Sequence, residues 1–156
     1  SQAGDYNLPQ IMYDRLRLTK ERIEQMALGV RELVDLEDPI GEVMESSTRP
    51  NGMEITKVRV PLGVIAMFYE ARPNVTVDAA ALCMKTGNAV ILRGGKEAFH
   101  TNECLVNLLR DALTEVNLPA DAVELVTVTD RAAVSDLLRQ REYIDVVIPR
   151  GRCGPY

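Results

Sequence analysis

A short run of basic and glycine residues, Arg93-Gly94-Gly95-Lys96, has the composition of an anion-binding loop. Glycines let backbone N–H groups approach a ligand closely, and the two basic side chains add positive charge within one turn. A helix expected from about Ala98 would add the positive end of its dipole. A phosphate would suit this segment, and so would a plain surface turn with solvated charges. The P-loop and GxGxxG patterns are both absent, and the missing P-loop argues against a kinase or an ATPase.

Two further polar segments follow apolar runs. Glu70, Arg72 and Asn74 place a carboxylate, a guanidinium and an amide around Pro73. They could bind a charged substrate, or Glu70 and Arg72 could pair with each other while Asn74 caps the next helix. Pro149-Arg150-Gly151 repeats the arrangement at a later strand end, where a plain strand terminus is the simpler interpretation.

Histidine and cysteine offer little for metal or thiol chemistry. His100 is the only histidine and has no partner motif, so we expect it to be a surface residue. Cys83 and Cys104 lie on apolar helical faces and are predicted to be core residues. Cys153 has no His or Asp companion and is not interpreted as a nucleophile. The three cysteines show no metal spacing, so no metal site is predicted, and a reducing cytoplasm fits them best.

Strands and helices alternate around the polar segments. Residues 64–69 and 89–92 are apolar runs of strand length, and residues 76–86 between them have helical spacing and end at Gly87-Asn88. Strand, helix and strand within about thirty residues is typical of a right-handed βαβ unit. The loops that follow parallel strands meet at one edge of the sheet, where such folds bind ligands. We therefore expect the Glu70 and Arg93 segments to lie together at that edge.

The rest of the chain extends this pattern. A helix over 20–36 is expected behind Thr19, followed by an Asn-Gly hairpin over 42–60 that should pack on the domain or on a partner. Later helices are predicted over 98–116 and 131–140, the second capped by Asp130, and later strands over 122–128 and 143–148. The result is an α/β fold, an open, Rossmann-like parallel sheet with helices on both faces, plus a β-hairpin.

Apolar stripes identify the helix faces that should meet the core. In the first helix the stripe consists of Ile23, Met26, Ala27, Val30, Leu33 and Val34. In the helix over 98–116 it consists of Leu105, Val106, Leu108, Leu109, Ala112, Leu113 and Val116.

Length and composition limit the function classes. The chain has 156 residues, enough for one domain with a core, and a net charge of −5, which gives no general basic surface for nucleic acid. No apolar run approaches the roughly 20 residues of a membrane span. We therefore expect neither nucleic acid nor a membrane as a partner. Residues 1–5 are small and polar, and we expect residues 1–7 to be a disordered tail or an expression remnant.

Several stretches resemble one enzyme family. The segment over 59–98, which contains EARPNVT and LRGGKEA, and YIDVVIPRG over 143–151 resemble the gamma-glutamyl phosphate reductase family, also called glutamate-5-semialdehyde dehydrogenase. Residues 13–23 and 35–43 match the same family in the same order, so the resemblance covers about 8–151. It implies a fold of the aldehyde dehydrogenase superfamily. It also implies NADPH-dependent reduction of L-glutamyl 5-phosphate to L-glutamate 5-semialdehyde in proline biosynthesis.

The resemblance assigns roles to the polar segments. It places Arg93 near the adenosine ribose of NADPH, with Lys96 beside a 2′-phosphate and Gly94 and Gly95 permitting close approach. Residues 149–151 match the start of the pyrophosphate-binding segment. It places Asn74 near the asparagine that donates a hydrogen bond to the developing oxyanion. Glu70 and Arg72 are the expected substrate-binding pair, with Arg72 facing a carboxylate or phosphate.

The family also shows what this chain lacks. Its nucleophilic cysteine lies in a later domain, and none of Cys83, Cys104 or Cys153 matches it. We therefore expect residues 8–156 to be an NADP-binding domain portion that is inactive alone, with the catalytic domain absent. Two alternatives remain, namely the reductase half of a bifunctional kinase–reductase and a non-catalytic nucleotide-binding module. Self-association and association with glutamate 5-kinase are further expectations, and the final five residues, 152–156, depart from the family pattern.

Overall fold

Four parallel strands form the centre of the computed structural model, which describes residues 16–130 and 132–151. Their spatial order is β5 (Val123–Leu125), β4 (Ala89–Arg93), β3 (Val64–Tyr69) and β6 (Val146–Arg150). All three neighbouring pairs run parallel. The central strand β3 is largely buried, whereas β6 lies at the edge of the sheet formed by the described strands and is mostly exposed. The predicted parallel α/β sheet is confirmed.

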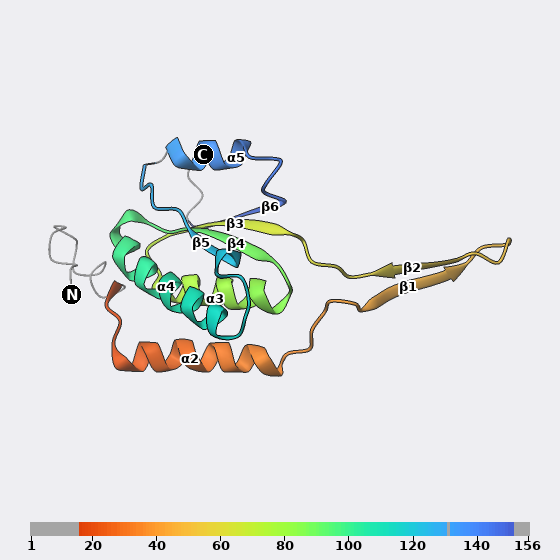
Figure 1. Ribbon diagram of the computed structural model, residues 1–156, viewed down its shortest axis with the longest axis horizontal. Helices are drawn as coiled ribbons and strands as arrows, with labels where there is room; N and C mark the ends of the chain where they lie inside the picture. The colour runs from red at the N-terminus through yellow and green to blue at the C-terminus, as the bar shows by residue number, and fades with distance from the viewer. Residues whose placement is uncertain (1–15, 131, 152–156) are drawn as a thin grey trace.

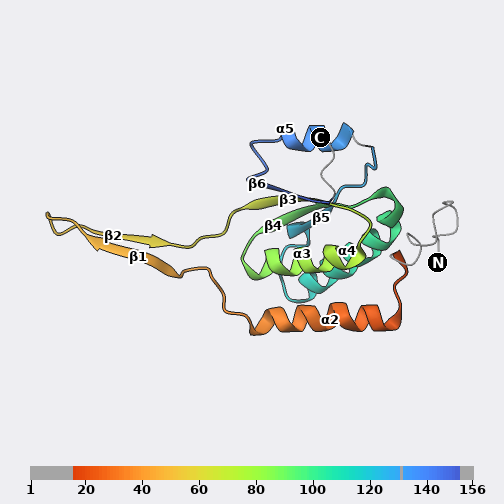
Figure 2. The ribbon, with the colours of Figure 1, turned by 180° about the vertical axis from the view of Figure 1, so that it is seen from behind.

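Helices cover both faces of this sheet (Figure 1). On one face α3 (Pro73–Lys85) and α4 (Phe99–Glu115) pack on the strands, and α2 (Lys20–Asp35) forms an outer layer. The opposite face carries α5 (Ala132–Arg139), as the view from behind also shows (Figure 2). This arrangement confirms the prediction of helices on both faces.

Local capping explains where the helices begin. The Thr19 side chain accepts a hydrogen bond from the Arg22 N–H at 3.3 Å, as the predicted N-cap of α2. The Asp130 side chain accepts from the Ala132 N–H at 3.0 Å at the start of α5. In contrast, α3 begins at Pro73, three residues before the predicted Thr76. Proline is favoured at the first helical position because the N–H it lacks would have no helical partner there.

Residues from β3, β4, β5, α3 and α4 form the main core. Its buried members are Ile65, Tyr69, Val75, Ala79, Ala80, Cys83, Val90, Leu92, Val106, Leu113 and Val123. A smaller cluster of Met26, Val77 and Leu105 joins α2 to α3 and α4. The prediction that Cys83 is a core residue is confirmed.

Other predicted core positions are wrong. Cys104 is exposed, and so are Leu108 at 66%, Ala112 and Val116 at 64%. Apolar residues extend around more of α4 than the sheet and α3 can cover, so the outer part of the predicted stripe meets no core. In α2, Ile23 and Val34 are likewise exposed, because this outer helix packs mainly through Met26.

Two strands also differ from their predicted ranges. β5 ends at Leu125, well before the predicted residue 128. β6 begins at Val146 because the N–H groups of Tyr143 and Ile144 both donate to the Gln140 carbonyl in a turn that follows α5. The strand then continues through Pro149 and Arg150, which were expected to follow it. Proline is tolerated there because β6 is an edge strand among those described.

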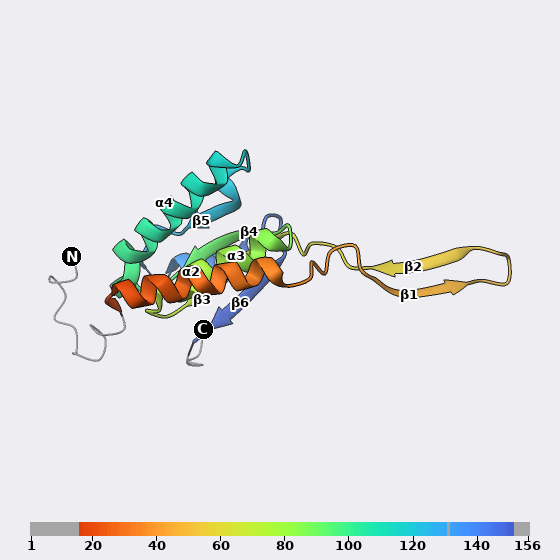
Figure 3. The ribbon, with the colours of Figure 1, turned by 90° about the horizontal axis from the view of Figure 1, so that it is seen from below.

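The hairpin projects away from the rest of the chain (Figure 3). Its strands β1 (Val43–Thr48) and β2 (Glu54–Val58) are antiparallel and joined at Asn51-Gly52, which confirms the hairpin. Every residue of both strands is exposed. The expectation that it packs on the domain is therefore wrong, while packing on a partner stays a prediction.

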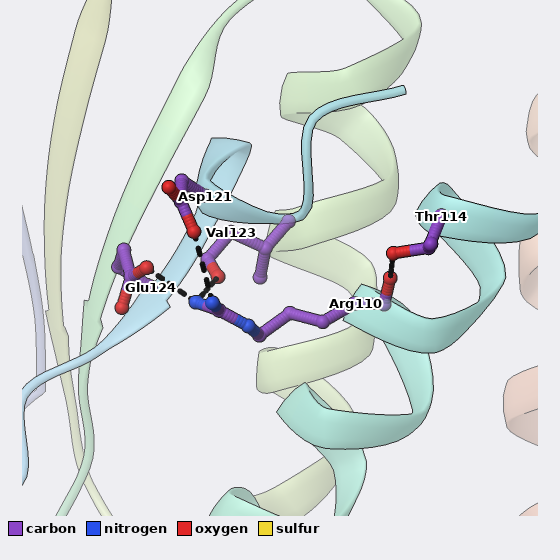
Figure 4. A network of polar contacts seen from close by, with 5 residues as sticks. All are labelled: Arg110, Thr114, Asp121, Val123 and Glu124. Atoms are coloured by element: carbon purple, nitrogen blue, oxygen red, sulfur yellow. Dashed lines mark hydrogen bonds and ion pairs between the residues drawn. The ribbon is translucent and has the colours of Figure 1, made fainter. Parts of the chain in front are cut away.

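A polar network fixes α4 against the start of β5 (Figure 4). The Arg110 guanidinium donates to the Asp121 carboxylate at 2.9 Å, to the Val123 carbonyl at 3.2 Å and to the Glu124 carboxylate. The Thr114 hydroxyl donates to the Arg110 carbonyl at 2.9 Å. One side chain thus binds the segment that leads into β5.

Some expectations concern residues that the structure does not describe, and others concern a membrane span or a metal site. The tail at 1–7, Cys153 and the end of the chain lie outside the described residues. Among the helices of the described ranges, none combines the length and apolarity needed to cross a bilayer. Residues 16–130 and 132–151 contain no group of three or more His, Cys, Asp or Glu placed to hold a metal ion.

Candidate functional site

The ends of three strands meet at one edge of the sheet. In the register of the sheet, Phe68 lies opposite Arg93, and Tyr69 lies opposite Arg150. A Cβ atom added at Gly151 would lie 3.1 Å from Glu70 Cγ, and one added at Gly95 would lie 3.4 Å from the Ala71 nitrogen. The loops after β3, β4 and β6 are therefore in contact, as the parallel-strand pattern predicts.

Three exposed basic residues lie around this edge. Arg72, Lys96 and Arg150 form no side-chain hydrogen bond or ion pair with any residue in the described ranges. Because these side chains have no ion-pair partner among the described residues, they can bind an anionic ligand such as a phosphate or carboxylate. Arg72 forms no ion pair with Glu70, so the proposed pairing within this loop is not seen.

Asn74 does not cap the helix that follows the loop. The N-cap position of α3 is Arg72, which makes no side-chain capping bond. Asn74 lies exposed in the first turn, and its amide nitrogen is 3.5 Å from an Asp78 carboxylate oxygen. The capping alternative is therefore wrong, while a role for Asn74 in catalysis stays a prediction.

Arg93 is held on one side only. Its Nη2 donates to the Thr129 carbonyl at 3.0 Å, which ties β4 to the loop after β5. Its Nε is buried and has no hydrogen-bond partner among the described residues. An unsatisfied buried donor costs free energy, so an acceptor atom of a ligand at this position would be stabilised. This observation fits the presence of a polar cofactor beside Arg93.

The two glycines of the Arg93 segment have different surroundings. A Cβ atom at Gly94 would lie 2.2 Å from Asn102 Nδ2, so a side chain is excluded by the packing beneath it. A Cβ atom at Gly95 would meet a Glu97 carboxylate oxygen at 2.8 Å, the mobile end of a flexible side chain. Gly95 thus lies in the more open position, and its carbonyl accepts the Ala98 N–H at 3.0 Å in the 3₁₀ turn before α4.

A buried polar network lies below this loop and was not predicted. The Tyr69 hydroxyl and Thr76 Oγ1 are 2.7 Å apart, and Thr76 Oγ1 donates to Asn102 Oδ1 at 2.9 Å. Burial raises the pKa of Tyr69 to about 12. Polar residues within helical patterns usually face solvent, so only the tertiary contacts identify this network.

The thiols and the histidine lie apart from the edge. Cys83 is in the core, where burial raises the pKa of its thiol. Cys104 lines a shallow hollow on the outer side of α4 together with Leu108 and Asp111. His100 is exposed, as predicted, with its Nδ1 3.8 Å from a Glu103 carboxylate oxygen.

The fold agrees with the comparison to known proteins. Residues 15–151 match the model of the aldehyde dehydrogenase family, and the chain belongs to this family. It is similar to gamma-glutamyl phosphate reductase from Geobacillus sp. (strain WCH70), with 55% identity over 150 residues that cover 96% of this chain and 36% of the relative.

Solved structures show the same similarity. The crystal structure of gamma-glutamyl phosphate reductase from Thermotoga maritima superposes with a TM-score of 0.89 at 43% identity, covering 92% of this chain and 35% of that one. The corresponding structure from Saccharomyces cerevisiae gives a TM-score of 0.82 at 35% identity, covering 96% of this chain and 38% of that one. The aldehyde-dehydrogenase type fold is thereby confirmed, and the chain spans about a third of the length of these relatives.

Proposed function

We propose that this chain is the cofactor-binding part of a gamma-glutamyl phosphate reductase. Such an enzyme is an oxidoreductase that reduces L-glutamyl 5-phosphate to L-glutamate 5-semialdehyde with NADPH in proline biosynthesis. The observation that carries the proposal is the contact between the loops after β3, β4 and β6 at one edge. These loops contain the EARPNVT, LRGGKEA and IPRG segments that resemble that family.

The proposed cofactor is NADPH rather than NADH. The family binds NAD(P), and the choice between the two rests on the Arg93 segment. Lys96 is exposed and has no side-chain partner among the described residues, so its ammonium group is available to a 2′-phosphate. Arg93 would hold the ribose, and Arg150 with Gly151 would hold the pyrophosphate. When bound, NADPH supplies the hydride, and the protein supplies its position and the surrounding charge.

The substrate is proposed to approach the loop after β3. Arg72 would bind the carboxylate or phosphate of the acyl phosphate, and Glu70 would line the substrate site beside it. Asn74 would donate to the oxyanion. The attacking thiol is assigned to protein outside this chain. Cys83 is unsuited because it is buried and its pKa is raised, which disfavours the nucleophilic thiolate, and Cys104 lies on the outer side of α4. This chain alone should therefore show no turnover.

The proposal extends to the surroundings of the protein. We place the protein in the cytoplasm. We also expect a homo-oligomer, because every residue in both strands of the projecting hairpin is exposed. Association with glutamate 5-kinase is proposed from the shared chemistry of the acyl phosphate. Either a separate kinase or a kinase domain in the same polypeptide would supply the acyl phosphate.

Calorimetric titration of NADPH and NADH into the chain tests the proposed function. Wild type should bind NADPH more tightly than NADH. Lys96→Ala should weaken NADPH binding by about 1 kcal/mol, roughly fivefold in Kd, because one exposed charge contact to a phosphate is lost. NADH binding should change little. Lys57→Ala, at an exposed lysine of β2, is the matched control. Equal affinity for the two cofactors in wild type would contradict the assignment of Lys96.

A further inference from the structure

Tyr69, Thr76 and Asn102 form a chain of hydrogen bonds across three elements. Tyr69 ends β3, Thr76 lies in the first turn of α3, and Asn102 lies in the first turn of α4. Thr76 and Asn102 are 0% and 1% exposed, and Tyr69 is 5% exposed. Buried polar groups in folded proteins are satisfied by partners, and Thr76 provides a partner for both the Tyr69 hydroxyl and the Asn102 amide oxygen.

The direction of the bonds follows from the donors available. Thr76 has one hydroxyl proton, which it donates to the amide oxygen of Asn102 at 2.9 Å. The Tyr69 hydroxyl must therefore donate to Thr76 Oγ1 at 2.7 Å. Removing the hydroxyl of Thr76 would leave both a buried donor and a buried acceptor without partners.

This network supports the Gly94 backbone directly. A Cβ atom at Gly94 would lie 2.2 Å from Asn102 Nδ2 and 3.1 Å from Tyr69 Cε2, so the network fills the space under the loop. A Cβ atom added at the next residue, Gly95, would lie 3.4 Å from the backbone nitrogen of Ala71, so this segment runs close to the loop after β3. A shift of Asn102 or Tyr69 would therefore move the segment that presents Lys96 relative to the neighbouring loop.

We propose that Tyr69, Thr76 and Asn102 are positioning residues that hold residues 94–96 in the geometry that binds the cofactor. The inference rests on the proposed function, because the ligand of this segment is taken to be NADPH. None of the three side chains needs to touch the cofactor. They act through the Gly94 backbone, which lies against them, and through the first turns of α3 and α4, which they join.

The first test measures order in the loop without any ligand. Thr76→Val removes the hydroxyl at nearly constant shape, and Thr76→Ser restores it. Hydrogen exchange by mass spectrometry should show amide exchange at 94–98 rising about tenfold in Thr76→Val and returning near wild type in Thr76→Ser. Thr114→Val is the matched control, since its hydroxyl bonds a carbonyl at the far end of α4. Tyr69→Phe, which removes only the terminal hydroxyl, replaces Thr76→Val if that variant does not fold.

The second test is NADPH titration of the same variants. Kd should rise about tenfold in Thr76→Val and return to within about twofold of wild type in Thr76→Ser. If wild type does not bind NADPH, the proposed function fails, and hydrogen exchange alone decides the positioning role. Unchanged exchange at 94–98 in Thr76→Val, together with a lowered Tm, would overturn the inference and make the network part of the core only.

Discussion

Replacing Asn88 with alanine should strongly destabilise the fold. Asn88 is 4% exposed, and its side-chain oxygen accepts the N–H groups of Leu62 and Gly63 at 2.6 and 2.9 Å. Its nitrogen donates to the carbonyl and the hydroxyl oxygen of Thr86 at 3.2 and 2.7 Å. The side chain thus joins the end of α3 to the segment that enters β3 from the hairpin.

The magnitude follows from these four hydrogen bonds. At a net value of about 1 kcal/mol each, and with water able to reach the partly exposed N–H groups, Asn88→Ala should lower the unfolding free energy by about 3 kcal/mol. Domains of this kind are stable by about 5–15 kcal/mol, so the loss is a large share. In urea it corresponds to a midpoint shift of about 1–2 M at an m-value near 2 kcal/mol per M.

Urea unfolding followed by circular dichroism measures this change. Asn107→Ala, at an exposed position of α4, is the matched control and should stay within about 0.5 kcal/mol of wild type. A loss below about 1 kcal/mol in Asn88→Ala would contradict a structural role for these four hydrogen bonds, because it would mean that water replaces them at almost no cost.

Two further predictions concern buried ionisable groups. Because the pKa of Tyr69 is raised to about 12 in the fold, above its usual value near 10, neutral Tyr69 stabilises the fold fully below about pH 10. At about 1.4 kcal/mol per pKa unit, this contribution is about 3 kcal/mol, and it is lost as pH rises from 10 through 12. The stability difference between wild type and Tyr69→Phe should therefore shrink between pH 9 and 12, and a constant difference would contradict the raised pKa. In a Cys153→Ser background, Ellman's reagent should label the exposed Cys104 rapidly. Cys83 should react only on unfolding, because it is buried and the pKa of its thiol is raised. Equal labelling rates for the two thiols would contradict the core position of Cys83.

The sequence predicts the sheet and its ligand edge because geometry connects them. Once residues 64–69 and 89–93 are parallel strands, their following loops must lie at the same edge. The positions of the Glu70, Arg93 and Arg150 segments therefore follow from periodicity and turn residues alone. The hairpin follows in the same way from Asn51-Gly52.

The surroundings of individual side chains are harder to predict from the sequence. Cys104 and Leu108 have the composition of core residues, but the number of apolar positions on α4 exceeds the surface that the sheet and α3 can cover. Thr76 and Asn102 show the reverse case, since polar residues on helices normally face water. Their burial depends on contacts between residues that lie 26 positions apart, which no local pattern contains.

The packing that requires glycine at positions 63 and 94 is visible only in the structure. Gly63 has φ of +110°, and a Cβ atom there would lie 2.1 Å from an Asp145 carboxylate oxygen that accepts the Val64 N–H. Position 94 requires a glycine because Asn102 occupies the space that a side chain would fill. Sequence assigned Gly94 to ligand approach, whereas the contact that excludes a side chain there comes from the protein itself.

The most direct test of the central claim is an NMR titration of the isotope-labelled chain with NADPH. We predict that chemical-shift changes of backbone amides concentrate in residues 70–72, 94–98 and 150–151, the loops at the edge of the sheet. The exposed hairpin and the hollow beside Cys104 should be unaffected. Shifts confined to those two regions, or no shifts at millimolar NADPH, would contradict the assignment of this edge as the cofactor site.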